Sequence, residues 1–347
     1  MKKIVVSLFV LVALLALIVV PTFAQDKPGT IADVVVASTN ASTPEFTTLL
    51  AAVQAADPAI MQLLSNPDAN VTVFAPTDAA FAAALQSLNM TADELLADQA
   101  LLNKVLMYHI VPGRFDAASV VALNGALLGT SLPETGLAIS VDGSQVKVND
   151  ATVVTPDVMA ANGVIHVIDT VLLPPMDNTM ATPEAMMTET MPMQPAGTIA
   201  DVVITSAKAS APEFTTLLAA VQAADPAILA ALTGNGPYTV FAPTDAAFNT
   251  ALASLKMTAA DLLNDKAMLT KILSYHVVPG YFSAATVISV AGVDGAKVAT
   301  LLPGTSVNIT VVNGSVKIND ATVITPDVIA SNGIIHVIDG VLLPPSA

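Results

Sequence analysis

The chain has 347 residues, no cysteine and a formal net charge of −16, with 28 acidic against 12 basic residues. Such an acidic chain repels phosphate-rich surfaces, because nucleic-acid binding depends on Lys and Arg neutralising phosphates, and we therefore expect no nucleic-acid partner. The absence of cysteine excludes disulfides, thiolate catalysis and cysteine-based zinc sites. With 54% hydrophobic residues the chain has enough material for a substantial core.

The N-terminus has the pattern of a secretory signal of bacterial type. Lys2 and Lys3 precede an apolar run over 4–20, and Ala24 closes a motif of small residues that suits cleavage. We expect residues 1–24 to be a signal peptide cleaved near Ala24. The alternative is a retained membrane anchor, although a run of about 17 residues is short for a span. No second long apolar run follows, so we expect a secreted, extracellular or periplasmic protein with no integral membrane segment after signal removal.

The remainder contains two copies of one pattern. The segment PEFTTLLAAVQAADPAI occurs at 44–60 and again at 212–228. Each copy has the size of a single domain, so we predict a first domain over 25–175 and a second over 197–347, each able to fold alone. Between them, 176–196 is rich in Met, Thr, Pro and Glu without apolar periodicity, which is typical of a linker.

Helices are predicted for the first half of each copy. Thr30, followed three residues later by Asp33, indicates a capped helix over 30–37, and Thr91 with Glu94 indicates a capping box. Apolar residues at helical spacing support the helices between these two points. The predicted helices begin near Thr30, Pro44, Asp57, Thr77 or Asp78, Thr91 and Leu101, and a strand at 71–74 interrupts them.

Strands are predicted for the second half. Asp142-Gly143 is a turn that favours positive φ, so its flanking segments are expected to form a hairpin. Helices precede strands without βαβ alternation, which favours an α+β fold with a mainly antiparallel sheet. The predicted strands are 108–111, 137–141, 145–148, 152–155 and 164–172.

Three motifs in this order resemble the fasciclin domain family. They are VTVFAPTDAAF at 71–81, MYHIVPG at 107–113 and NGVIHVIDTVLLPP at 162–175, and the second copy repeats each of them with small changes. The resemblance covers nearly all of both copies. It implies two tandem fasciclin-type (FAS1 / βIg-h3) domains, each a β-sandwich or wedge with helices packed around it, in an extracellular adhesion protein.

The resemblance also implies a contact region. In animal members of the family the Tyr-His region is associated with receptor binding, which makes Tyr108, His109, Tyr275 and His276 the candidate partner-binding residues. The expected partner is an extracellular protein or polysaccharide. Their position within apolar stretches equally fits a structural role in the core.

The remaining titratable residues have structural explanations. His166 and His336 each lie in a Val-Ile-His-Val-Ile or Ile-Ile-His-Val-Ile strand, so burial is expected to hold their pKa below about 6.5. Asp78 and Asp245 follow Pro-Thr and are predicted to be helix caps rather than catalytic acids. Asp169 and its copy Asp339 are expected to fix a neighbouring loop by hydrogen bonds.

The sequence favours a noncovalent binding module over an enzyme. It holds no nucleophile elbow, P-loop, EF-hand loop or His-Glu zinc motif, and we expect neither catalytic nor metal-ligating residues and no cofactor. Two alternatives stay open. One is an unrecognised hydrolase, and the other is a periplasmic protein that binds Cu(I) through thioethers of the linker. The linker methionines are Met176, Met180, Met186, Met187, Met191 and Met193.

Overall fold

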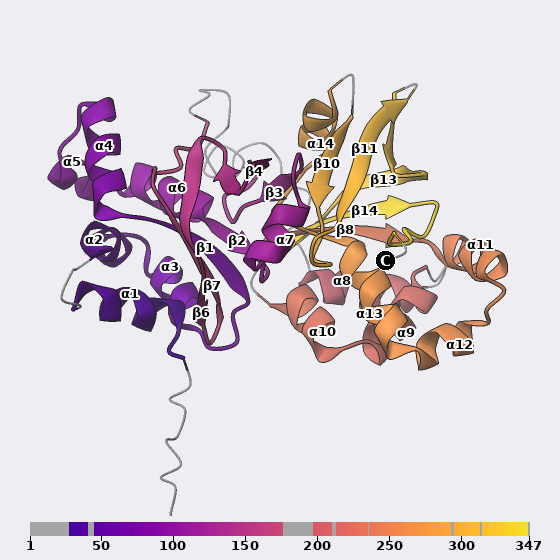
Figure 1. Ribbon diagram of the computed structural model, residues 1–347. Coiled ribbons are helices and arrows are strands. Elements are labelled where there is room, and N and C mark those ends of the chain that lie inside the picture. The colour runs from indigo at the N-terminus through magenta and orange to yellow at the C-terminus, as the bar shows by residue number, and fades with distance from the viewer. Residues whose placement is uncertain are drawn as a thin grey trace, which may run out of the picture.

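The computed structural model describes residues 28–40, 45–175, 197–209, 213–234, 236–292, 295–312 and 314–345. The predicted signal peptide and the predicted linker lie outside these residues. Two domains of like architecture lie side by side (Figure 1), with α5 (Ala92–Ala97) and α12 (Ala259–Asn264) at opposite ends. Among the described residues no single helix is long and apolar enough to span a bilayer. One pair of helices, α9 (Thr215–Ala223) and α10 (Pro226–Thr233), passes that test together but bends by 120°.

Each domain has seven helices and seven strands within the described residues. The first domain contains α1 (Ile31–Thr39), α2 (Thr47–Ala55), α3 (Pro58–Ser65), β1 (Val71–Pro76), α4 (Asp78–Leu88), α5, α6 (Gln99–His109), β2 (Ile110–Pro112), α7 (Ala117–Ala122), β3 (Leu127–Gly129), β4 (Gly136–Asp142), β5 (Gln145–Val148), β6 (Ala151–Ala160) and β7 (Gly163–Ile168). The second contains α8 (Ile199–Ala207), α9 (Thr215–Ala223), α10 (Pro226–Thr233), β8 (Tyr238–Pro243), α11 (Asp245–Leu255), α12, α13 (Lys266–Tyr275), β9 (Val277–Pro279), α14 (Ala284–Ala291), β10 (Ala296–Ala299), β11 (Ser306–Val312), β12 (Ser315–Ile318), β13 (Ala321–Ala330) and β14 (Gly333–Ile338).

The strands of each domain form a mainly antiparallel sheet with one parallel pair. In the first domain the order is β2-β1-β7-β6-β5-β4-β3, and the second domain has the corresponding order in reverse. β1 and β7 run parallel, from Val71 opposite Gly163 to Pro76 opposite Ile168. The predicted α+β class is therefore confirmed, and the parallel pair, next to the β2 edge of the sheet, places the first strand of the domain beside the last.

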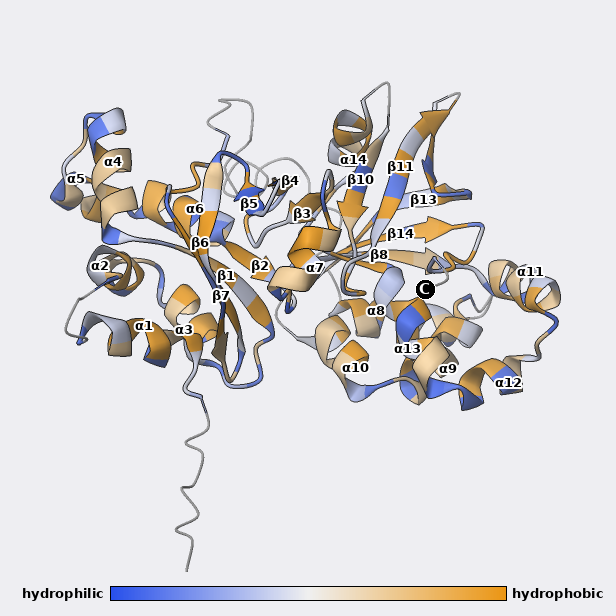
Figure 2. Cartoon of the chain, in the orientation of Figure 1, coloured by the Kyte–Doolittle hydropathy of each residue, from blue (hydrophilic) through white to orange (hydrophobic). Residues whose placement is uncertain are grey.

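Two apolar clusters fill each domain, one on either side of the parallel pair. In the first domain the helices α1 to α6 bury one cluster, which includes Leu49, Phe81 and Leu102. The other lies among the later strands and includes Phe74 and Phe115, each no more than 1% exposed. Figure 2 shows the same distribution, with hydrophobic colour along the central strands and hydrophilic colour at the turns.

The capping boxes predicted for Thr30 and Thr91 are both present, but Asp78 has a different role from the one expected. Thr77 caps α4 by accepting a hydrogen bond from the Ala80 N–H. The carboxylate of Asp78 instead accepts from Thr47 N, Thr47 Oγ1 and Thr48 N at 3.1, 2.6 and 2.8 Å. It thereby satisfies the free N–H groups of α2, whose own N-cap, Phe46, is left-handed and offers no side-chain acceptor.

Replacing Asp78 by Ala is therefore expected to lower the free energy of unfolding by about 1–2 kcal/mol, the usual effect of losing a helix cap. Urea unfolding measures this, with Asp68→Ala as the control because Asp68 is an exposed carboxylate outside any helix. Equal stability of the two variants would show that Asp78 does not hold α2.

Several predicted boundaries were wrong. The segment 108–111 was predicted as a strand, but α6 continues through His109 and only Ile110 begins β2. The strand expected to end before Pro156 continues to Ala160, because two register shifts against β7 accommodate the proline. The closing strand ends at Ile168 rather than at Leu172. The short elements α7 and β3 were not predicted.

Candidate functional site

The four predicted partner-binding residues lie inside the two domains. Tyr108, His109, Tyr275 and His276 are 3%, 3%, 4% and 2% exposed. The Tyr108 hydroxyl donates to Gly136 O at 3.2 Å and accepts from Asn149 Nδ2 at 3.0 Å, and Tyr275 has the same two kinds of partner. Burial raises the pKa of Tyr108. Partner binding through these residues stays a prediction.

His109 connects the end of α6 to the chain after β7. Its Nε2 accepts from the Leu172 N–H at 2.9 Å, so this nitrogen carries no proton and the neutral ring carries its proton on Nδ1. Nδ1 donates to Val105 O at 2.7 Å. Burial lowers the pKa of His109 to about 4, although the Val105 carbonyl opposes the shift. His276 bonds in the same way to Leu342 N and Ile272 O, and burial lowers its pKa to about 4 as well.

His166 links strand β6 to the segment that contains Phe115. Its Nε2 donates to Phe115 O at 2.8 Å, and its Nδ1 accepts from the Asp157 N–H at 3.3 Å. The ring stacks on Phe74 with the ring centroids 5.6 Å apart. Burial lowers the pKa of His166, against the opposing effects of the Phe115 carbonyl and of Asp157 and Asp116. The buried, low-pKa histidine predicted from the sequence is confirmed here and in His336.

Asp157 in turn fixes the middle of β6. The residue has φ of +59°, and its carboxylate accepts from the Ala117 N–H at the start of α7 at 2.8 Å. Asp327 repeats both features in β13, bonding to Ala284 N and to His336 Nδ1. A left-handed conformation is disfavoured for any residue with a Cβ and persists where surrounding bonds fix it. The two domains therefore hold the same strand in the same irregular shape.

The part of β6 held in this way is exposed. Val154 is 51% and Met159 is 45% exposed, and their counterparts on β13, Ile324 and Ile329, are 53% and 42% exposed. Residues 154–157 and 324–327 are exposed without interruption. We call these segments, 154–159 and 324–329, the β6 surface and the β13 surface. Neither surface was predicted from the sequence, because the strand was expected to end before Pro156 and in fact continues past it.

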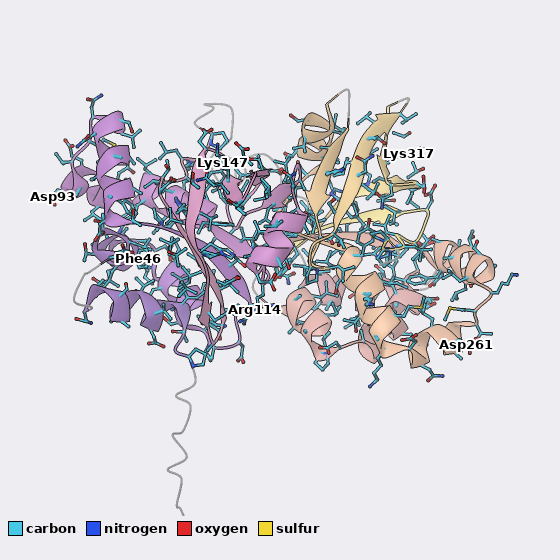
Figure 3. All side chains as sticks on the ribbon, viewed as in Figure 1. Phe46, Asp93, Arg114, Lys147, Asp261 and Lys317 are labelled. Atoms are coloured by element: carbon cyan, nitrogen blue, oxygen red, sulfur yellow. The ribbon has the colours of Figure 1, made fainter. Side chains whose placement is uncertain are left out.

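Arg114 borders the β6 surface. Its Nη2 lies 3.3 Å from the Met159 sulfur, and Figure 3 shows the residue on the side of the first domain that faces the second. The second domain carries Tyr281 at the equivalent position, where burial raises the pKa of the phenol and the carboxylates of Glu134 and Asp327 add to that shift. The two surfaces therefore expose apolar side chains at the same positions and differ in charge at one border.

The acidic residues occupy structural positions. Asp169 Oδ1 accepts from Thr152 N at 2.8 Å and from Thr170 Oγ1 at 3.0 Å, and Asp339 bonds likewise to Thr322 N. The hydrogen bonding is as predicted, but its main partner is the start of strand β6 or β13 and not a loop. Within the described part of the chain no group of three or more His, Asp or Glu side chains is placed to hold a metal ion.

An apolar cavity of about 30 Å³ lies among α1, α2, α3, α6 and β1. Its lining is aliphatic and aromatic apart from His109, both of whose ring nitrogens are engaged by the backbone. It therefore offers no free polar group to orient a substrate.

The fold and these surfaces can be compared with known proteins. The fasciclin domain matches residues 44–174 and 212–344, and the chain belongs to the fasciclin-domain family. In line with this membership, the tandem organisation read from the sequence is confirmed.

Relatives occur in bacteria and in animals. Protein sll1483 of Synechocystis is 47% identical over 150 residues, which cover 43% of this chain and 78% of that protein. Immunogenic protein MPB70 of Mycobacterium bovis is 39% identical over 143 residues, covering 41% and 69% of the two chains. The transforming growth factor-beta-induced protein ig-h3 of Sus scrofa is 29% identical over 278 residues, which cover 80% of this chain and 35% of that protein.

Among solved structures, a FAS1 domain pair from the insect cell adhesion molecule Fasciclin I is similar over 84% of this chain and 94% of that chain, with a TM-score of 0.37 and 20% identity.

Proposed function

We propose that the protein is a secreted or cell-surface binding module that contacts an extracellular protein through the β6 and β13 surfaces. The main support is that both domains expose an equivalent irregular strand, which an equivalent histidine and aspartate hold in each. Membership of the fasciclin-domain family and the relatives in that family support a location outside the cell and a role in adhesion.

The chemistry of the two surfaces favours a protein partner. Each offers exposed aliphatic side chains beside backbone polar groups: β5 pairs only with Ala151 and Thr152, so the rest of β6 has β7 as its one strand neighbour among the described residues. An extended peptide can pair with such an edge and place apolar side chains against it. Pro156 and the bulges limit uncontrolled pairing between edges.

In our proposal the buried Tyr-His pairs contribute to binding indirectly, by holding the domain structure. His109 holds the chain that follows β7, and Tyr108 holds β4 through Gly136. Both contacts fix the sheet that carries β6. A substitution at either residue then weakens binding by loosening the domain rather than by removing a contact.

The alternatives lead to different observations. A polysaccharide partner would survive protease treatment of the target. The Cu(I) alternative concerns residues 176–193, which lie outside the described residues, and stays a prediction. A hydrolase would turn over a defined substrate, whereas the ring nitrogens of the four histidines are engaged in the structural hydrogen bonds given above.

Binding to the extracellular matrix deposited by the source organism tests the proposal. The matrix is coated on a biosensor, and the intact chain is compared with Val154→Asp, Ile324→Asp and the double variant. A charge placed on an apolar contact is expected to weaken each single variant about tenfold or more and to abolish binding by the double variant.

Two controls make the result specific. Leu229→Asp introduces the same charge at an exposed apolar residue of α10 and is expected to bind as the unmodified chain does. Protease treatment of the matrix should remove the signal and periodate should not. Unchanged binding by the double variant would overturn the assignment of the surfaces, and a signal lost only with periodate would identify a polysaccharide instead.

A further inference from the structure

The two domains are joined by strand pairing as well as by the chain. β3 of the first domain and β10 of the second run parallel, with Leu127 opposite Val298, so that the two sheets form a single 14-stranded sheet. Figure 1 shows both strands at the middle of the molecule. Ala299 is fully buried and belongs to the apolar cluster of the first domain.

Equivalent positions of the two repeats differ where the domains meet. Gly129 corresponds to Ala299 in the second repeat. A Cβ at Gly129 would lie 1.9 Å from the carbonyl oxygen of Pro279, so only glycine permits β9 to approach β3 this closely. At the equivalent position of the second repeat, the methyl group of Ala299 is instead buried in the apolar cluster of the first domain.

A second difference places a leucine against the first domain. Leu301 packs on the apolar cluster that contains Phe115, and its Cδ2 would lie 2.8 Å from a Cβ at Gly113. The equivalent residue of the first repeat is Ser131, which is 4% exposed and whose hydroxyl has no hydrogen-bond partner among the described residues. The larger apolar residue is thus present only in the second repeat, where it packs on the first domain.

A third difference is Glu134, which has φ of +60° where the second repeat has Gly304 at +69°. The Glu134 N–H donates to Tyr281 O at 2.8 Å, and its carboxylate accepts from the Ser283 N–H at 3.2 and 3.3 Å. Ser283 is the N-cap of α14, where a negative charge is favoured by the helix dipole. The turn adopts this left-handed conformation in both repeats, but only the first repeat places there a residue with a Cβ, at a conformational cost, and the carboxylate of that residue bonds to the other domain.

We propose that the two domains form a matched pair, in which each face fits the other domain but not a copy of itself. In a pair of two first domains, Glu134 would meet Asp116, which occupies the position of Ser283, and the two carboxylates would repel each other. In a pair of two second domains, the methyl group of Ala299 would stand where Gly129 is needed. The matched pair stays associated without the connecting segment and holds the β6 and β13 surfaces in one relative orientation.

Cutting the folded chain tests this directly. A specific protease site is introduced within residues 176–196, the full chain is cut after folding, and the products are analysed by size-exclusion chromatography with light scattering. The two halves are expected to co-elute with the mass of one first and one second domain at about 10 μM, a concentration at which specific interfaces persist.

Gly129→Ala is expected to weaken the pair at least about tenfold, because its Cβ meets Pro279 O. The matched control is Gly136→Ala on the paired strand β4, where the added Cβ makes ordinary contacts of 3.5 Å or more. Glu134→Gly provides a second variant: it keeps the left-handed turn, removes the carboxylate and is expected to weaken the pair with both halves folded, as shown by circular dichroism.

Three results would overturn the proposal. They are separate elution of the unmodified halves at about 100 μM, recovery of pairs of like domains, and equal association of Gly129→Ala and Gly136→Ala. None of these results depends on the unidentified binding partner, so this proposal and the proposed function can fail separately.

Discussion

His109→Ala is expected to lower the free energy of unfolding of the first domain by about 3 kcal/mol or more. The substitution leaves the buried Leu172 N–H without an acceptor, which costs about 1–3 kcal/mol, and the cavity that replaces the ring adds to this. Urea unfolding followed by circular dichroism measures the loss. Lys104→Ala is the control on the same helix, because Lys104 is exposed and its truncation should change stability by less than about 0.5 kcal/mol.

The same variant separates the two explanations of the Tyr-His region. If His109 acts by holding the chain after β7, matrix binding falls only to the extent that the first domain unfolds. Full stability together with lost binding would instead show that the imidazole itself reaches the partner, and would contradict its structural assignment.

Stability is expected to fall as the pH is lowered from about 6.5 to about 4. The pKa of His109 and of His276 is about 4 in the folded chain and about 6.5 in an unfolded chain. Between these values the unfolded chain binds protons that the folded chain does not, so acid favours unfolding. The stabilising contribution is complete above pH 6.5, and at about 1.4 kcal/mol per pKa unit its loss is on the order of 3 kcal/mol per domain.

Calorimetric unfolding between pH 7.5 and 4, at constant ionic strength, measures this dependence. His109→Gln, which does not titrate, should make the dependence of the first domain shallower, with His166 supplying the remainder because burial lowers its pKa too. Carboxylates with a lowered pKa, such as Asp78, affect stability in a more acidic range. Their stabilising contribution is lost only as the pH falls below about 4. A flat profile from pH 7 to 4.5 would contradict neutral buried histidines.

Local signals in the sequence predicted much of the fold. Thr30 and Thr91 specify helix starts through bonds to residues three positions away, and the Asp142-Gly143 turn specifies its hairpin. The apolar neighbours of His166 predicted its burial correctly. Each of these features depends on side chains close together in the sequence, which is why pattern and spacing were sufficient.

Features that depend on distant residues were missed. The bonds from Asp78 to α2 span about thirty positions, and no local pattern distinguishes them from a cap on its own helix. The continuation of β6 past Pro156 depends on register shifts against β7. The contact of Gly129 with Pro279 joins two domains that the repeat pattern presents as separate units. The exposed surfaces were missed for the same reason, because exposure is decided by which neighbours a strand lacks.

The most direct test of the binding-module account is how binding depends on target density. The intact chain and the Val154→Asp variant are each titrated over matrix coated at increasing density. When the target is dense, the β6 and β13 surfaces of one molecule can bind at the same time, which raises the apparent affinity without new contacts. The account predicts that the apparent Kd of the intact chain falls by at least about tenfold as density rises, while that of Val154→Asp stays constant. The same density dependence for both proteins would contradict a module that binds through both domains.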